Sequence, residues 1–396
     1  MKPKSRISRR QFLIGAGAAM GGLALAEARR RLAQAGVPQG EGDLYLPLVK
    51  GGQSSRHRVV HVHSLNATHW NGENKYWEHV DQPTVNDMVN QGIMTLTGKM
   101  SAEQAWRAIL PNYQPGQKIA IKVNFNNTWQ CQDEDAKIDA LPHPVNAVVS
   151  GLELIGVARS DVCVYDAIRA IPGYFAANCL DGISLYDGSY QGVCRNPAGF
   201  SYTSDSRVEF NPPSGVTPPE VYVTNVLMNA SYLINMPIMK AGHPIAGVTL
   251  GAKNHFGTIN SPSSVHTLVN VVGGTARDDY NPLVDFFRSP LIGGKTVLTV
   301  GDGLFAARVF SQAPQTWTTF GGKVPNSLFF SRDMVAVDCV MRDLLAAEVG
   351  SALTAKANNY LRLAGQAGLG VFEQGNPWQM PYGSGYNSIS YMRIEI

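Results

Sequence analysis

The stretch Lys118-Ile-Ala-Ile-Lys-Val-Asn124 decides the fold of this chain. It is a short apolar run that ends in polar residues, and a second run of this kind follows at Asp161-Val-Cys-Val-Tyr-Asp166. Between them, Pro144–Gly156 has the apolar period of a helix. A strand, a helix and a strand at this spacing predict a βαβ unit with parallel strands.

The same alternation continues on both sides of this unit. Ser101 and Asp333 are expected N-caps of the helices that follow them. The sequence therefore predicts an α/β fold with a largely parallel sheet flanked by helices, and a long Gly-, Pro- and Ser-rich loop or insert around residues 186–220. The other expected strands are Arg58–His63, Tyr232–Met236 and Thr296–Gly301, and the other expected helices are Ala102–Leu110, Pro282–Phe287, Met334–Val349 and Thr354–Ala364.

The first 35 residues have the pattern of a twin-arginine export signal. Ser8-Arg-Arg-Gln-Phe-Leu-Ile14 leads into the uncharged, mildly apolar stretch Phe12–Ala26, and Ala33-Gln-Ala35 is a small-x-small cleavage site. The pattern predicts a periplasmic or otherwise exported protein, cleaved after Ala35, with no stable membrane anchor in the mature chain. An uncleaved anchor is the alternative interpretation.

Removal of this leader changes the charge balance of the chain. Residues 1–35 hold eight of the 33 basic and one of the 30 acidic side chains, which leaves a mature chain with 25 basic and 29 acidic side chains. A net negative charge, with aromatic residues scattered outside any basic stretch, does not favour nucleic acid as a partner.

The five cysteines contain no C-x-x-C spacing. This excludes the usual iron–sulfur patterns, and the chain also lacks a flavin or nucleotide signature after the leader. Cys179 and Cys194 lie in a loop-like stretch and are the candidate disulfide pair if the protein works in an oxidising compartment.

Chemically active side chains are densest between residues 240 and 257. Lys240, His243, Lys253, Asn254 and His255 fall within 16 residues and are spaced by glycines, a composition that suits neither a core nor a long helix. Lysine attracts carboxylate or phosphate groups, and histidine transfers protons. This block is therefore the main candidate site.

Polar residues at the ends of expected strands are further candidates. Lys122 and Asn124 share one face of their strand, while Asp166 and Asp302 follow two other strands. Ligands of open α/β sheets bind beyond the carboxyl ends of the strands. The alternative is that these Asn and Asp residues only form turns or cap helices.

These blocks resemble the family described as domain of unknown function 362. The resemblance runs from about residue 118 to 366 and implies an α/β fold with a shared polar site, but no reaction. Some relatives carry a ferredoxin-like iron–sulfur module, for which this chain lacks the cysteines. The matching pieces are Ile121–Phe125, His143-Pro144 at a helix start, Ile234–Lys240 with His243, Gly247–Asn254, His266, Val300–Gly303 and Ser331–Asp338.

The leader motif and the resemblance together divide the chain into expected parts. Residues 1–35 are the signal peptide, residues 36–117 a histidine-containing segment packed on the main domain, residues 118–366 the family domain, and residues 367–396 a C-terminal extension.

His61 and His63 are candidate metal ligands. Histidines at i and i+2 of a strand point to the same side, so both can bind one ion, with Asp166, Asp302 or a histidine of the central block completing the shell. In the alternative interpretation, His63 only hydrogen-bonds near the strand end. The cofactor is therefore unknown, and a metal ion is one candidate.

Two functional hypotheses follow. In the first, the protein is a periplasmic enzyme that acts on a small anionic molecule through a Lys/His/Asp cleft. In the second, it is a non-catalytic periplasmic protein that binds a ligand, or a protein partner during assembly, in the same cleft. The candidate catalytic residues are His243, His255, Lys253 and Asp302, and the candidate ligand-binding residues are Lys122, Asn124, His143, Lys240, Asn254 and His266.

Overall fold

The computed structural model describes residues 57–396 except 133, 189–191, 270 and 273–274. The expected signal peptide and its cleavage site lie outside the described residues. Within the described part, one mixed and mostly parallel sheet of 11 strands carries helices on both faces, which confirms the α/β fold.

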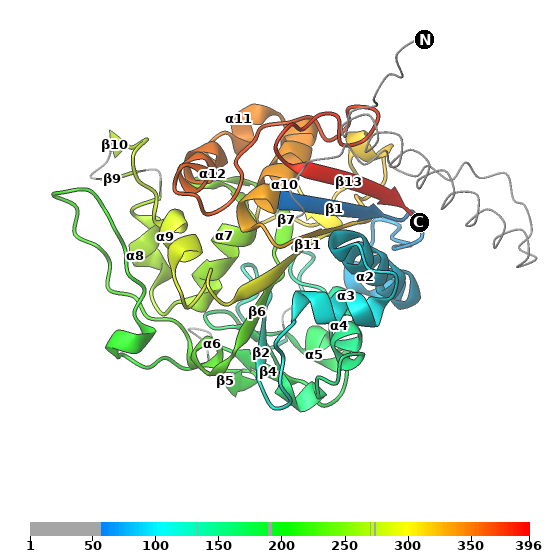
Figure 1. Ribbon diagram of the computed structural model, residues 1–396, viewed down its shortest axis with the longest axis horizontal. Coiled ribbons are helices and arrows are strands. Elements are labelled where there is room, and N and C mark those ends of the chain that lie inside the picture. The colour runs from blue at the N-terminus through cyan, green and yellow to red at the C-terminus, as the bar shows by residue number, and fades with distance from the viewer. Residues whose placement is uncertain (1–56, 133, 189–191, 270, 273–274) are drawn as a thin grey trace, which may run out of the picture. The chain divides into compact units, whose positions relative to one another are not determined.

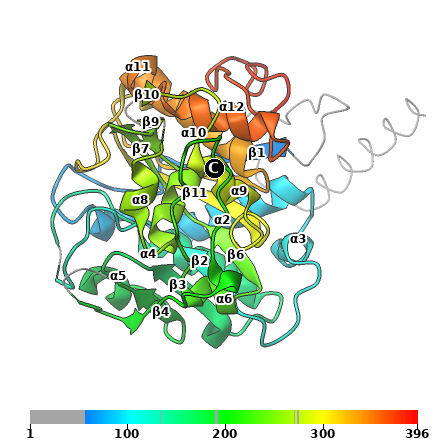
Figure 2. The ribbon, with the colours of Figure 1, turned by 90° about the vertical axis from the view of Figure 1, so that its left-hand side faces the viewer.

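The sheet has the strand order β13-β1-β12-β11-β6-β2-β3-β4-β5, and β7 and β8 form a hairpin attached to β11. Only β12 and the β7–β8 pair introduce antiparallel neighbours among these strands. Figure 2 shows β6, β2, β3 and β4 in this order. The strands are β1 Arg58–His63, β2 Ile119–Lys122, β3 Val162–Asp166, β4 Ser184–Asp187, β5 Asn196–Pro197, β6 Tyr232–Asn235, β7 Ile238–His243, β8 Gly247–Thr249, β11 Thr296–Ala307, β12 Ser327–Ser331 and β13 Ser390–Glu395, with a separate pair β9 Val271–Val272 and β10 Thr275–Ala276.

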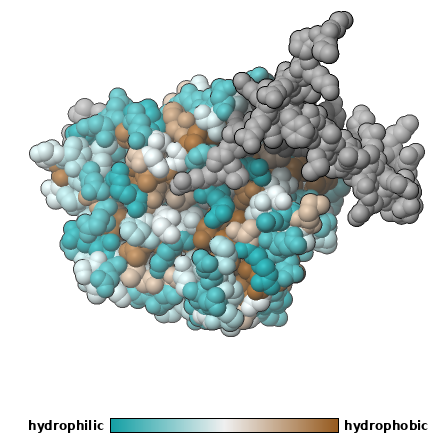
Figure 3. All heavy atoms as spheres, viewed as in Figure 1, coloured by the Kyte–Doolittle hydropathy of each residue, from teal (hydrophilic) through white to brown (hydrophobic). Residues whose placement is uncertain are grey.

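The longest helices in the described part are α2 and α10. None of the described helices is long and apolar enough to span a membrane. On the face of the molecule in Figure 3, the coloured residues alternate between hydrophilic and apolar. The helices are α2 Gln82–Thr97, α3 Ala102–Ile109, α4 Pro142–Glu153, α5 Gly173–Ala177, α6 Asn225–Asn229, α7 Gly251–Asn254, α8 Pro262–His266, α9 Pro282–Arg288, α10 Met334–Val349, α11 Ser351–Thr354 and α12 Ala357–Gln366.

Two hydrophobic cores cover the two faces of the sheet. Ile119 and Ile121 of β2 pack into the core that contains the buried residues of α2, α3 and α4. Ala120, between them, packs into the opposite core with residues of α9, α10 and α12. Figure 1 shows these two groups of helices on opposite sides of β1 and β11. Because helices cover both faces, the central strands are apolar at consecutive positions. These apolar runs are the pattern that predicted the strands from the sequence.

The two ends of the described chain meet in the sheet. β13, from the expected C-terminal extension, pairs in parallel with β1, from the expected N-terminal segment (Figure 1). α2 packs against β1 and α4. Residues 57–117 and 367–396 therefore contribute to the same sheet and cores as the family domain.

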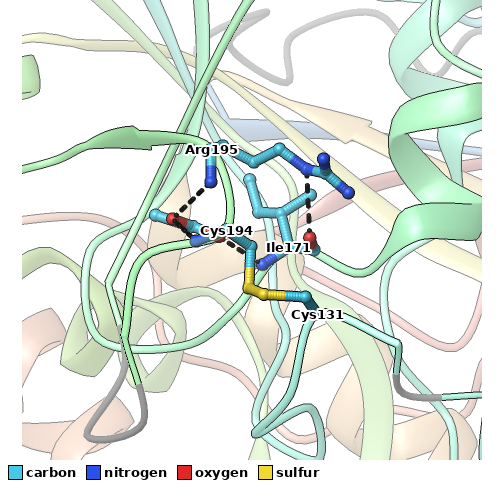
Figure 4. Close-up of a disulfide and its surroundings, with 5 residues drawn as sticks. Cys131, Ile171, Cys194 and Arg195 are labelled. Atoms are coloured by element: carbon cyan, nitrogen blue, oxygen red, sulfur yellow. Dashed lines mark hydrogen bonds between the residues drawn. A yellow bond between two sulfur atoms is a disulfide. The ribbon is translucent and has the colours of Figure 1, made fainter.

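The expected pairing of Cys179 with Cys194 is wrong. Cys194 forms a disulfide with Cys131, and Cys179 is a free thiol (Figure 4). The loop after β2 carries Cys131 toward the segment before β5, where the Asp187 carboxylate accepts hydrogen bonds from the backbone N–H groups of Cys194 and Arg195 at 3.1 Å. The bridge thus joins the loop after β2 with the loop after β4, two strands that β3 separates in the sheet.

Candidate functional site

A row of buried polar side chains crosses the sheet near the carboxyl ends of its parallel strands. Lys122 of β2 is the register neighbour of Asn235 of β6, and Asn235 is the neighbour of Thr299 of β11. Register neighbours point to the same face of a sheet, so these three side chains line up on the α7 and α10 side. All three are buried. An α/β sheet binds ligands at this edge, which makes the row a candidate site.

Lys122 forms a buried ion pair with Asp166. Its Nζ lies 3.1 Å from Oδ2 of Asp166 and 3.3 Å from Oδ1 of Asn254, and it also donates to the Val123 carbonyl. Burial lowers the pKa of Lys122, and Asp166 opposes this shift. A Cβ at Gly257 would lie 2.5 Å from both Lys122 Nζ and Asp166 Oδ1, so only glycine lets the backbone pass so close to the pair.

Asn254 and Asn124 connect Lys122 with Lys240, and a third asparagine, Asn235, bonds to Asn254. Nζ of Lys240 donates to Oδ1 of Asn124 at 2.7 Å, Nδ2 of Asn124 donates to Oδ1 of Asn254 at 3.2 Å, and Nδ2 of Asn254 donates to Oδ1 of Asn235 at 2.8 Å. Each amide uses its oxygen for one neighbour and its nitrogen for the next, which fixes the orientation of the chain of amides.

Lys240 has no carboxylate partner among the residues that the structure describes. Within this part of the chain, neither Lys240 nor Lys253 lies within 4.0 Å of a carboxylate oxygen, whereas Lys122 contacts Asp166. Burial lowers the pKa of Lys240 to about 8, although Asp139 and Asp166 favour its charged form from a greater distance. Thr249 of the neighbouring strand β8 is the register partner of Lys240. Its buried hydroxyl has no hydrogen-bond partner among the described residues.

Lys253 lies among aromatic rings. Its Nζ is 2.7 Å from Nε2 of His266 and 3.6 Å from the ring centre of Phe256. The His266 ring is parallel to that of His243, with their centroids 5.7 Å apart. Burial, followed by the charges of Lys240 and Arg169, holds the pKa of Lys253 well below its usual value.

His243 and His266 are half-buried and neutral at physiological pH. Burial followed by Lys253 lowers the pKa of both histidines, to about 3 for His266. Nδ1 of His243 accepts from the backbone N–H groups of Ile245 and Ala246 at 3.3 and 3.1 Å. The proton of the neutral His243 ring is therefore on Nε2.

We name these three lysines and the side chains that contact them the lysine site. It contains Lys122, Lys240, Lys253, Asn124, Asn254, Asp166, His243 and His266. The sequence placed all of them except Asp166 among its candidate site residues, and it singled out Asp166 only as a strand end and a possible metal ligand. With three buried lysines and one paired carboxylate, the site can hold an anion.

Three candidate residues have other surroundings. Oδ1 of Asp302 accepts from the N–H of Leu304 at 3.0 Å, and no described histidine contacts this carboxylate. His255 is buried, with Nδ1 3.2 Å from Oγ1 of Thr258 and Nε2 without a partner. His143 is the second residue of α4, as expected, and only burial shifts its pKa, to about 4.

Ring nitrogens of both candidate metal ligands already make hydrogen bonds. Nδ1 of His61 is 2.7 Å from the Tyr391 hydroxyl, and Nε2 is 2.8 Å from Oγ of Ser327. Nδ1 of His63 contacts the Glu395 carboxylate. His61 could therefore bind a metal only by giving up one of these bonds, and the residues that the structure describes contain no group of three or more His, Cys, Asp or Glu arranged to hold an ion.

Three residues outside the list of candidate site residues support the site. The Asp338 carboxylate of α10 accepts from the backbone N–H groups of Gly251 and Ala252 at 2.7 and 3.1 Å, and so fixes the start of α7, which carries Lys253 and Asn254. Asn235 lies at the end of β6, inside the block Ile234–Lys240 that resembles the family, and Arg169 lies three residues after the strand end at Asp166. These positions in the sequence could have identified Asn235 and Arg169 as candidate site residues.

Asp302→Asn is expected to stabilise the protein by about 1–3 kcal/mol at pH 8, and to have little effect near pH 4. Burial raises the Asp302 pKa from 3.8 to about 7, so the folded protein keeps a proton that the unfolded chain loses in this pH window. Stability therefore falls as the pH rises from about 4 to 7. Urea unfolding of both proteins across this range measures the effect, and a pH-independent difference would contradict the assignment.

The comparison with known families agrees with the resemblance seen in the sequence. A family model described as "Domain of unknown function (DUF362)" matches residues 119–343, more than half of the chain. No curated protein matches the chain. The matched region spans β2 to α10 and includes every residue of the lysine site.

Proposed function

This chain belongs to the DUF362 family, a domain of unknown function, and we propose that it is an exported enzyme that acts on a small anionic molecule bound at the lysine site. The observation that carries the proposal is the burial of Lys240 and Lys253 with no carboxylate oxygen within 4.0 Å among the described residues. Transfer of a cation from water into a protein interior costs several kcal/mol unless an opposite charge compensates it. A bound anion would supply that charge.

The histidines favour an enzyme over a simple binding protein. His243 and His266 stack beside Lys253, and both are neutral, so each has one nitrogen that carries a proton and one that accepts it. Groups of this kind next to a bound anion can transfer protons to and from it. The alternative, a non-catalytic periplasmic ligand-binding or assembly protein, requires only the lysines.

The first test is stabilisation by anions at constant ionic strength. Inorganic phosphate, succinate and pyruvate are expected to raise the melting temperature above that in sodium chloride of equal ionic strength, because they bind the folded state selectively. If all three salts have the effect of chloride, the anion site is wrong. Consumption of a stabilising anion, followed by NMR over hours, would favour the enzyme, and stable binding would favour the alternative.

Export is the second part of the proposal. The Ser8–Ile14 motif supports it, and so does the Cys131–Cys194 disulfide, because such bonds persist in oxidising compartments and are rare in the cytoplasm. We expect wild-type cells to hold a processed, disulfide-bonded chain in the periplasm. Arg9→Lys with Arg10→Lys should leave a full-length, reduced chain in the cytoplasm. Cell fractionation with thiol labelling measures both, and equal distribution of the two proteins would argue against this route.

A further inference from the structure

We propose that Lys253 is an amine nucleophile that forms an imine with the carbonyl group of a small carboxylate, such as a 2-oxo acid. The inference rests on the proposed function, since it assumes that an anion enters the lysine site. It adds the substrate class and the covalent step.

Lys253 is the least buried lysine of the site, with 6% of its surface exposed, whereas Lys122 and Lys240 have none. The two histidines beside it are also half-buried rather than buried. Asp166 holds Lys122 and Asn124 holds Lys240, whereas the contacts of Lys253 Nζ within the described residues are with His266 and the face of Phe256.

The surroundings of Lys253 favour a neutral amine. No carboxylate lies within 4.0 Å of its Nζ in the described part of the protein, and the nearest hydrogen-bond partner is a histidine nitrogen. At 2.7 Å, one N–H of Lys253 can donate to Nε2 of His266 when the proton of the neutral ring is on Nδ1.

This pair can carry out the proton transfers of imine formation. The neutral Lys253 amine attacks the carbonyl carbon to form a C–N bond, and one of its two protons passes through Nε2 of His266 to the carbonyl oxygen, which becomes a hydroxyl. The second nitrogen proton passes through His266 to this hydroxyl, which leaves as water as the C=N bond forms. One carbonyl and one amine thus give one imine and one water, with no oxidant or reductant.

The cations around Lys253 select a carbonyl compound that also carries a carboxylate. Lys240 and Arg169 are the two charged groups that act most strongly on Lys253. Arg169 lies with its guanidinium 3.6 Å from the ring centre of Trp129. A carboxylate held by these cations next to a carbonyl at Lys253 corresponds to a 2-oxo acid.

Reductive trapping tests the proposal. The whole mature protein is incubated with pyruvate and sodium cyanoborohydride, and its intact mass and tryptic peptides are measured. We expect one reduced pyruvyl group per chain, attached to Lys253. Lys253→Arg should abolish the adduct, and His266→Gln should slow its formation by about 100-fold. Lys118→Met, at the opposite end of β2, is the control and should label like the wild type.

The outcomes separate this inference from the proposed function. An adduct on other lysines, or none in wild type that pyruvate still stabilises, would overturn the imine but leave the anion site intact. Absence of both the adduct and anion stabilisation would remove both proposals. If Lys253→Arg does not fold, the adduct position in the wild-type peptides still decides the question.

Discussion

Asp166→Asn is expected to destabilise the protein by about 3–5 kcal/mol, because it leaves the Lys122 ammonium buried without a charged partner. Lys122 is completely buried, and Asp166 is its ion-pair partner at 3.1 Å. The Asp166 carboxylate also accepts from the backbone N–H of Phe125 at 3.1 Å, so the substitution weakens the start of the loop that follows Asn124. Urea unfolding at pH 7 measures the loss.

The double variant Lys122→Met with Asp166→Asn is the matched control. Removal of both charges eliminates the unpaired cation, so most of the lost stability should return. A loss below about 1 kcal/mol for Asp166→Asn alone is typical of exposed ion pairs and would show that water reaches Lys122.

Lys240→Met is expected to separate stability from ligand binding. The substitution removes a buried cation that has no carboxylate within 4.0 Å in the described part of the protein, and it leaves Oδ1 of Asn124 without this donor. We expect the anion-free protein to stay within about 1 kcal/mol of wild type. Stabilisation by an anion, about 2.7 kcal/mol at 100 times its Kd, should fall close to zero.

The same substitution at a lysine outside the site is the control for this variant. Nζ of Lys295 donates to the backbone carbonyls of Leu227 and Ala230, at the amino-terminal side of β11. Lys295→Met should keep the full anion response. Thermal unfolding with and without succinate gives both values. Destabilisation of Lys240→Met by several kcal/mol, or an unchanged anion response, would mean that Lys240 is a structural residue.

The sequence predicted helices and strands correctly where the spacing of apolar residues and the capping residues indicate the same bounds. The expected bounds of β1 and α10 match the structure, and Asp333 caps α10 as expected. By contrast, α2 was missed, because Pro, Gly, Asn and Thr in Gln82–Thr97 weaken its helical pattern. β13 was also missed. It is an edge strand whose partner β1 lies more than 300 residues away, so no local pattern indicates it.

The sequence could predict which residues form the site, but not which of them contact one another. Lys240, Lys253 and His243 stood out because polar side chains spaced by glycines suit neither a core nor a helix. That Lys122 pairs with Asp166 depends on the parallel register of β2 with β3. Likewise, the hydrogen-bond partners of His61 come from β12 and β13. Such contacts depend on tertiary structure and leave no signal in residue spacing.

The most direct test of the central claim, that an anion binds against the unpaired lysines, is the number of protons taken up on binding. Burial places the pKa of Lys240 at about 8, so part of the population is neutral at that pH. An anion beside it raises this pKa and draws a proton from the buffer. Calorimetric titration with succinate at pH 8 in Tris and in HEPES, which differ in ionisation enthalpy, measures the uptake. We predict net proton uptake that Lys240→Met reduces. Binding without proton exchange would place the anion on fully charged surface groups and contradict the claim.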